Sequence, residues 1–121
     1  MDTYSIKRAD EIDVVEMDGG CLHWYASAEK GNSAAQTLGR CILYPGGSNP
    51  VHFHPNCEEI LHVLSGEIEH YIEGDGWIKM GPGDTITLPV DVPHQARNTG
   101  TEDAHMIICF SDGDRKTVGK K

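Results

Sequence analysis

The sequence is short of positive charge and contains no long hydrophobic run. Ten lysine and arginine residues stand against 19 aspartate and glutamate residues, which gives a formal net charge of −9. Nucleic acids and anionic membranes attract basic surfaces, so neither is expected as a partner. No stretch is long enough to cross a bilayer, and no cationic start leads into an apolar run. We therefore expect a soluble, cytoplasmic protein.

Closely spaced cysteines are also missing. The four cysteines lie far apart and never form a C-x-x-C pair, which argues against a zinc knuckle and against a disulfide-rich scaffold. The length of 121 residues is typical of one compact domain. A chain of this size buries roughly two thirds of its unfolded surface, so one core is sufficient without disulfides. The sequence predicts a single domain over residues 1–121.

Convincing helical periodicity is absent as well. Apolar or alternating runs are separated by segments rich in Gly, Pro, Asn and Asp, a pattern typical of strands joined by turns. Only residues 7–17 are ambiguous. Many short strands on one small chain predict an all-β sandwich or barrel. The expected strands cover residues 22–26, 36–44, 58–66, 67–73, 76–80, 84–89 and 104–110.

The stretch HFHPNCEE, residues 52–59, concentrates metal-binding side chains. On a strand His52 and His54 share a face, and Pro55 then ends the strand. The chain can return with Glu58 or Glu59 beside the histidines. Imidazole and carboxylate together suit Mn, Fe, Co, Ni or Zn. A polar barrel rim without metal is the alternative interpretation.

A second segment, LPVDVPHQARN, supplies a further histidine. His94 follows a proline-framed turn, and Asn98 lies on the same strand face. For Asn98, structural hydrogen bonding is the favoured role over metal binding.

Both segments resemble the two sequence motifs of small monodomain cupins. The first motif, G-x5-HxH-x3–4-E-x6-G, and the second, G-x5-PxG-x2-H-x3-N, are matched in spacing, and the similarity runs from about residue 36 to 110. The second motif departs at Asp91, where the family usually has glycine; aspartate tolerates left-handed backbone better than most residues. The matching residues are Gly46, His52, His54, Glu59 and Gly66 in the first motif and Gly83, Pro89, His94 and Asn98 in the second.

The resemblance implies a double-stranded β-helix, the jelly-roll barrel of cupins, with one divalent metal inside it. The implied ligands are His52, His54, Glu59 and His94, and the motif spacing selects Glu59 over Glu58. The metal would be Fe, Mn, Ni, Co or Zn, and an octahedral ion would keep two positions open. With one carboxylate ligand the site would carry about +1 charge, which favours an anionic ligand.

The resemblance also divides the chain and suggests its assembly. A core over about 36–110 would follow N-terminal strands within 1–35 and precede a mobile, solvated C-terminal tail over 111–121. Because small cupins commonly pair or exchange N-terminal strands, a homodimer is expected.

Functions of small cupins fall into several classes. The favoured hypothesis is a metal-dependent enzyme acting on a small anionic or polyhydroxylated molecule, with dioxygenase-type oxidoreductase chemistry preferred. An isomerase, lyase or cyclase is the first alternative. A non-catalytic module that binds a metal or a sugar is the second.

Other polar residues have two interpretations each. His70, His105 and Arg40 are candidates for the substrate pocket, but a core or surface role is favoured for each of them. Cys57 lies two residues before Glu59, where an inert thiol is favoured over a redox-sensitive one.

Overall fold

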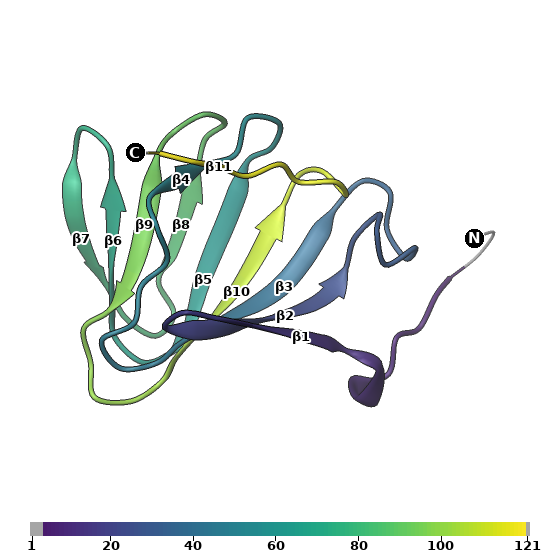
Figure 1. The fold of residues 1–121 in the computed structure, drawn as a ribbon, viewed down its shortest axis with the longest axis horizontal. Coiled ribbons are helices and arrows are strands. Elements are labelled where there is room, and N and C mark those ends of the chain that lie inside the picture. Colours follow the sequence, from purple (N-terminus) through teal and green to yellow (C-terminus); the bar gives the residue numbers. More distant parts are fainter. Residues whose placement is uncertain (1–3, 121) are drawn as a thin grey trace.

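The structure is a computed structural model that describes residues 4–120, and it consists almost entirely of antiparallel strands (Figure 1). Two sheets form the sandwich, which confirms the predicted all-β, double-stranded β-helix fold. One short 3-10 helix, η1 (Ala9–Glu11), precedes the first strand. The first sheet has the order β1 (Asp13–Met17), β2 (Gly20–Ala26), β3 (Thr37–Leu43), β10 (Ala104–Phe110), β5 (Glu59–Ser65), β8 (Thr85–Leu88). The second sheet has the order β11 (Val118–Gly119), β4 (His52–Phe53), β9 (His94–Asn98), β6 (Ile68–Ile72), β7 (Gly76–Met80).

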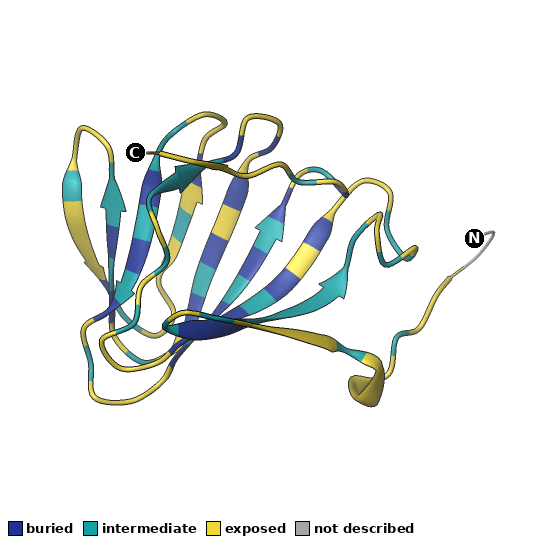
Figure 2. Cartoon of the chain, viewed as in Figure 1, coloured by how far each residue is buried: buried dark blue, intermediate teal, exposed yellow. Residues whose placement is uncertain are grey.

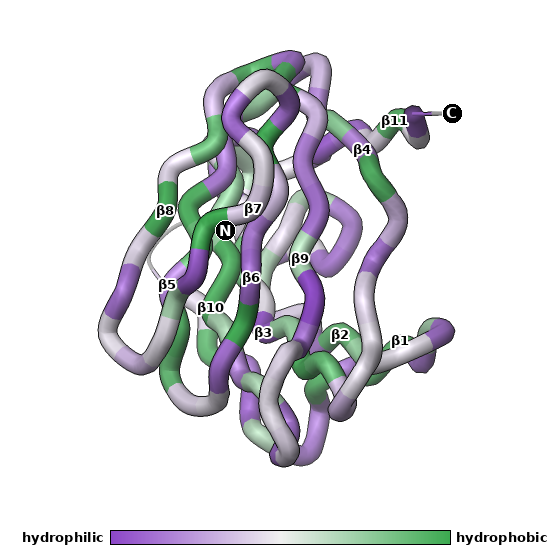
Figure 3. Tube along the Cα trace, turned by 90° about the vertical axis from the view of Figure 1, so that its left-hand side faces the viewer, coloured by the Kyte–Doolittle hydropathy of each residue, from purple (hydrophilic) through white to green (hydrophobic). Residues whose placement is uncertain are grey.

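The period of two along the central strands separates a core face from an outer face. Buried and exposed bands alternate along β3 and β5 (Figure 2). On β3, Cys41 and Leu43 are buried, whereas Arg40 and Ile42 lie on the opposite face. β10 is hydrophobic over most of its length (Figure 3) and lies between β3 and β5. The core is built from these inward positions and includes Leu43, Leu61, Val63, Ile68, Met106, Ile108 and Phe110.

The ambiguous N-terminal segment forms η1 and β1. β1 pairs with β2 and is the outermost strand of the first sheet. Val14 and Val15 of this strand are exposed in the monomer.

The C-terminal segment, expected to be a mobile, solvated tail, is paired with the barrel, and most of its residues are exposed. β11 pairs with β4, so residues 111–120 run along the barrel (Figures 1 and 3). Backbone hydrogen bonds fix this path, from Ser111 N to Glu58 O and from Lys120 N to Val51 O. The predicted tail also included Lys121, which lies outside the described residues. No helix among residues 4–120 has the length and apolar character needed to span a membrane.

Candidate metal centre

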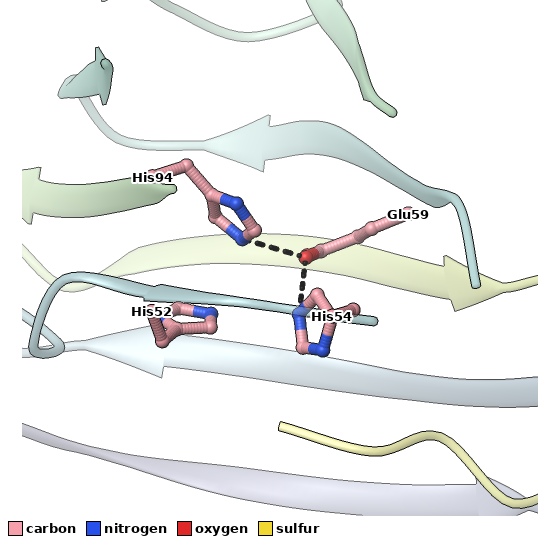
Figure 4. Close-up of side chains that lie close together, drawn as sticks. All are labelled: His52, His54, Glu59 and His94. Carbon is pink, nitrogen blue, oxygen red and sulfur yellow. Dashed lines mark hydrogen bonds and ion pairs between the residues drawn. The ribbon is translucent and has the colours of Figure 1, made fainter. Parts of the chain in front are cut away.

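The four predicted ligands converge in the structure (Figure 4). His52 lies on β4 and His54 directly after it, while Glu59 and His94 are the first residues of β5 and β9. β4 pairs with β9 with His52 opposite His94, which brings the two HxH histidines beside the third. One nitrogen or oxygen from each residue lies within 4.8 Å of those of the other three. His54, Glu59 and His94 are buried, and His52 is half-buried at the cavity.

Each imidazole is oriented by a backbone carbonyl. The Nδ1 atoms of His52, His54 and His94 lie 2.7, 2.9 and 2.9 Å from the carbonyl oxygens of Pro50, Lys116 and Val92, respectively. A carbonyl oxygen accepts only, so each Nδ1 carries the proton and each Nε2 presents a lone pair. Hydrogen bonds from Nδ1 to a backbone carbonyl are a usual way in which proteins orient metal-binding histidines.

The Nε2 atoms of two histidines face the carboxylate. Oε1 of Glu59 lies 3.2 Å from Nε2 of His54 and 3.1 Å from Nε2 of His94 (Figure 4). Burial alone would raise the pKa of Glu59, but the contacts with His54 and His94 outweigh it and lower the pKa to about 2. Glu59 is therefore ionised at neutral pH, and an Nε2 lone pair cannot face its oxygen at these distances unless a proton or a metal cation lies between the two atoms.

A metal cation can supply that positive charge. Burial is the main cause that lowers the pKa of His52 to about 4, so its ring is neutral at pH 7. Buried charges in proteins are paired or coordinate metals. Three imidazoles oriented by backbone carbonyls and one carboxylate form a donor set suited to Mn, Fe, Co, Ni or Zn, and these residues fit such an ion.

A cavity of about 320 Å³, a volume within the range of small-molecule sites, adjoins three of the four residues. His52, His54 and Glu59 lie on its wall, and most of the remaining wall is apolar. The apolar residues include Met17, Leu22, Trp24, Leu61, Ala96, Ile108 and Phe110.

The three further pocket candidates lie elsewhere. Arg40 and His105 are on the outer face of the first sheet, with Nη1 of Arg40 3.5 Å from Nδ1 of His105. They are separated from the cavity because the inward positions of β3 and β10 belong to their sequence neighbours. His70 is only 1% exposed and stacks on His94, with ring centroids 5.6 Å apart, but it does not line the cavity.

The turn before His94 has the geometry that the second motif requires. Asp91 has φ of 70°, and no other non-glycine residue among residues 4–120 has positive φ. Its N–H donates to the carbonyl of His54 at 3.0 Å, which ties the two motifs together. Asn98 is buried and structural, as expected: Nδ2 donates to the carbonyls of Leu43 and Glu102 at 2.8 and 2.7 Å.

Cys57, two residues before Glu59, is buried. It is 1% exposed, and burial raises the pKa of its thiol. Both properties favour the inert thiol over a redox-sensitive one.

Sequence reasoning missed Arg115, which lies on the cavity wall beside Trp24 and Phe110. In the sequence this arginine belongs to a basic terminal run, and such runs are usually solvated. The signal that could have drawn attention to it is the neighbouring Thr117-Val118, a short β-prone pair that could pair with a nearby strand.

Comparison with known proteins places the chain in a family. Residues 39–110 match the model of the cupin domain, so the chain belongs to the cupin family. It is 28% identical over 106 residues to the polyketide synthase CurC of Streptomyces cyaneus, covering 83% of this chain and 68% of that protein. It is 31% identical over 108 residues to oxalate oxidase 1 of Hordeum vulgare, covering 84% of this chain and 48% of that one.

Solved structures give the same fold. An oxalate oxidase superposes with a TM-score of 0.76 and 25% identity, covering 84% of this chain and 55% of that chain. The oxalate decarboxylase of Lactobacillus farciminis superposes with a TM-score of 0.82 at 18% identity, covering 91% of this chain and 34% of that chain. The chain thus spans about two thirds of CurC and less than half of the barley oxidase.

Proposed function

We propose that this cupin is a metal-dependent enzyme that acts on a small anionic molecule. The observation that carries the proposal is the buried cluster of three carbonyl-oriented imidazoles around one carboxylate, next to a cavity that can admit a ligand. A purely structural metal site is normally closed by protein ligands on all sides, whereas this one faces a cavity.

The proposed function assigns a role to each group of residues in the site. His52, His54, His94 and Glu59 would hold the ion, and the three carbonyl contacts would keep the Nε2 lone pairs directed at it. A divalent metal bound there would act as a Lewis acid towards a carboxylate, carbonyl or enolate oxygen. With a single carboxylate ligand, the site favours a negatively charged ligand although the whole chain carries a formal charge of −9. The apolar wall would exclude water around the reacting group and strengthen electrostatic contacts there.

Oxidoreductase chemistry of the dioxygenase type is our first candidate for the reaction. The relatives that support an oxidoreductase are the oxalate oxidases, such as the one from Hordeum vulgare. A solved oxalate decarboxylase of Bacillus subtilis with the same fold carries Mn(II) centres, which makes manganese, together with iron, the first metal to test.

An isomerase, lyase or cyclase is the second candidate. It is favoured by the decarboxylase structures of the same fold, because decarboxylation is lyase chemistry. Oxygen uptake by Mn- or Fe-reconstituted protein separates the two candidates, with oxalate and then other small carboxylates as substrates. Uptake that scales with metal content and disappears in His94→Ala supports the oxidoreductase. Turnover under anaerobic conditions supports the second candidate. Binding without turnover under either condition would contradict the enzyme proposal and leave a binding module.

We also propose that the protein forms a homodimer through its N-terminal strand. Within residues 4–120, β1 pairs only with β2, and it exposes Val14 and Val15, with 51% and 48% of their surface accessible. Exposed hydrophobic edge strands pair readily with another chain.

A further inference from the structure

Arg115 lies on the cavity wall with its guanidinium group against two aromatic rings. Its Cζ atom is 4.4 Å from the centroid of the Trp24 ring and 5.1 Å from that of Phe110. Arginine over an aromatic face at these distances gains cation–π attraction, which fixes the position of the group while leaving its N–H donors free for other partners.

No aspartate or glutamate within residues 4–120 forms an ion pair with Arg115. Its one side-chain hydrogen bond in that part of the chain runs from Nη1 to Oγ1 of Thr117, at 2.6 Å. Arg97 provides the contrast, because it covers the Trp77 ring but also donates to Oε1 of Glu69 through Nε and Nη2. Arg115 is half-buried, and burial lowers its pKa, although the charge of Glu59 acts in the opposite direction without direct contact; its guanidinium is therefore partly desolvated and touches no carboxylate of the described residues. A partly desolvated guanidinium with unused donors is a site for an anion.

Two residues close to Arg115 in the sequence, Phe110 and Lys116, connect it to the proposed metal centre. The ring of Phe110 lies 5.0 Å from the ring of His54, so one aromatic side chain contacts both the arginine and a proposed metal ligand. The next residue, Lys116, supplies the carbonyl that orients His54. Arg115 and the metal ligands therefore face one cavity from neighbouring positions on its wall.

The rest of the cavity wall limits the chemistry of the ligand. Apart from the proposed metal ligands, Arg115, Asn49 and Thr117, the wall is made mainly of aliphatic and aromatic side chains. A sugar or another polyhydroxylated molecule would leave its hydroxyl groups unpaired against such a wall, at a cost for each. Oxalate has no apolar part to bury there. A molecule that carries a carboxylate and a second oxygen function on an apolar body satisfies Arg115, the metal centre and the apolar wall.

We propose that Arg115 binds the carboxylate of a small substrate whose aliphatic or aromatic body packs on the apolar wall, with a second oxygen function directed at the metal centre. This inference rests on the proposed function and narrows its substrate class. Arg115 is a substrate-binding residue in this account, with no role in holding the metal.

Isothermal titration of the full-length, metal-loaded protein tests the proposal. The probes are benzoate, phenylacetate and hexanoate as apolar carboxylates, phenylacetamide as the neutral counterpart of phenylacetate, and oxalate. The wild type should bind at least one apolar carboxylate more tightly than oxalate and phenylacetamide. Arg115→Gln should weaken that carboxylate about tenfold or more and leave phenylacetamide within about twofold, because only the charged hydrogen bonds are lost. Arg115→Lys should bind the carboxylate with an affinity between those of the wild type and Arg115→Gln, since lysine keeps the charge but loses the bidentate geometry.

Arg97→Gln is the matched control, because it removes an arginine stacked on a tryptophan away from the cavity, and it should bind like the wild type. Metal content measured on every variant separates the two proposals. If Arg115→Gln keeps its metal and binds the carboxylate as tightly as the wild type, or if oxalate binds more tightly than every apolar carboxylate, the inference is overturned. If the wild type takes up no metal, the proposed function fails, and repeating the titrations on the metal-free protein still decides whether Arg115 binds the carboxylate.

Discussion

The Nδ1 atom of His54 lies 2.9 Å from the backbone carbonyl oxygen of Lys116, 62 residues later in the chain. A proposed metal ligand is thus oriented by the C-terminal segment, and that segment is held in place by the pairing of β11 with β4. The proposed metal centre consequently depends on residues far outside its two sequence motifs.

Removal of the segment should weaken the metal site. A chain that ends at Asp114 lacks the carbonyl of Lys116 and the pairing of β11, so the His54 ring loses its orientation. Loss of such an outer contact typically lowers metal affinity about 10- to 100-fold. Competition with a chromophoric chelator measures the affinity, and a chain that ends at Lys120 is the control. Equal affinities of the two truncated chains would show that the segment does not orient His54.

Asp91 should limit the stability of the turn before His94. Its φ of 70° lies in the left-handed region, where glycine is free of strain and a β-branched residue is not. Asp91→Gly should leave the free energy of unfolding unchanged or raise it by up to about 1 kcal/mol, whereas Asp91→Val should lower it by about 1–2 kcal/mol. Asp91→Asn, which tolerates the same backbone, is the control. Urea unfolding of chelator-treated protein measures all four chains, and a Val variant as stable as the Gly variant would contradict the argument.

Stability should fall in mild acid, partly because of His70. Burial is the main cause that lowers the pKa of His70 from 6.5 to about 4. Between these values the unfolded chain binds a proton that the folded chain does not, so folding is stabilised above pH 6.5 and the stabilisation is lost as the pH falls towards 4. Glu59, with its pKa lowered from 4.5 to about 2, adds a further loss below pH 4.5.

Replacing His70 by leucine should remove the contribution of His70 to the pH dependence of stability. Between pH 7.5 and 4.5, the drop in the free energy of unfolding should be about 2 kcal/mol smaller in His70→Leu than in the wild type. Chemical denaturation of metal-free protein at both pH values gives the two drops. Identical drops in the two proteins would mean that His70 does not titrate as its burial implies.

Charge placed on the free edge strand should prevent the proposed dimer. Val14→Lys and Val15→Lys put a solvated charge into the pairing surface of β1, a device that natural edge strands use against association. Light scattering should give a dimer for the wild type and a monomer for the double variant. Lys substitution of exposed Ile78 on β7, in the other sheet, is the control and should leave the dimer intact. A wild-type monomer at high concentration would overturn the dimer proposal.

Alternation and turn residues were sufficient for seven of the eleven strands in residues 4–120, and the resemblance to the cupin motifs was sufficient for the four clustered residues. The period of two puts His52 and His54 on one face, and the spacing to Gly66 selects Glu59, which the structure brings beside His94. The departure at Asp91 was interpreted through backbone preference, and the positive φ confirms it.

Two features of the structure could not be predicted from the sequence: which face of β3 lies inside, and where Arg115 lies. Alternation shows that Arg40 shares a face with Leu38 and Ile42, but both faces of β3 carry apolar residues, so it does not tell which face is inside. The position of Arg115 depends on the pairing of β11 with β4, which joins segments more than 60 residues apart. Neither a periodic pattern nor a short motif reports on such a long-range contact.

The most direct test of the account is the metal content of untagged protein, purified without chelator under anaerobic conditions. Elemental analysis should find about one divalent transition metal ion per chain, as expected for a single site with four protein ligands. His94→Ala should lose the metal, and His62→Ala, whose side chain lies on the outward face of β5 and contacts Thr85, should keep it. Wild-type protein that holds far less metal, and that cannot be filled with manganese, iron, cobalt, nickel or zinc, would contradict the account.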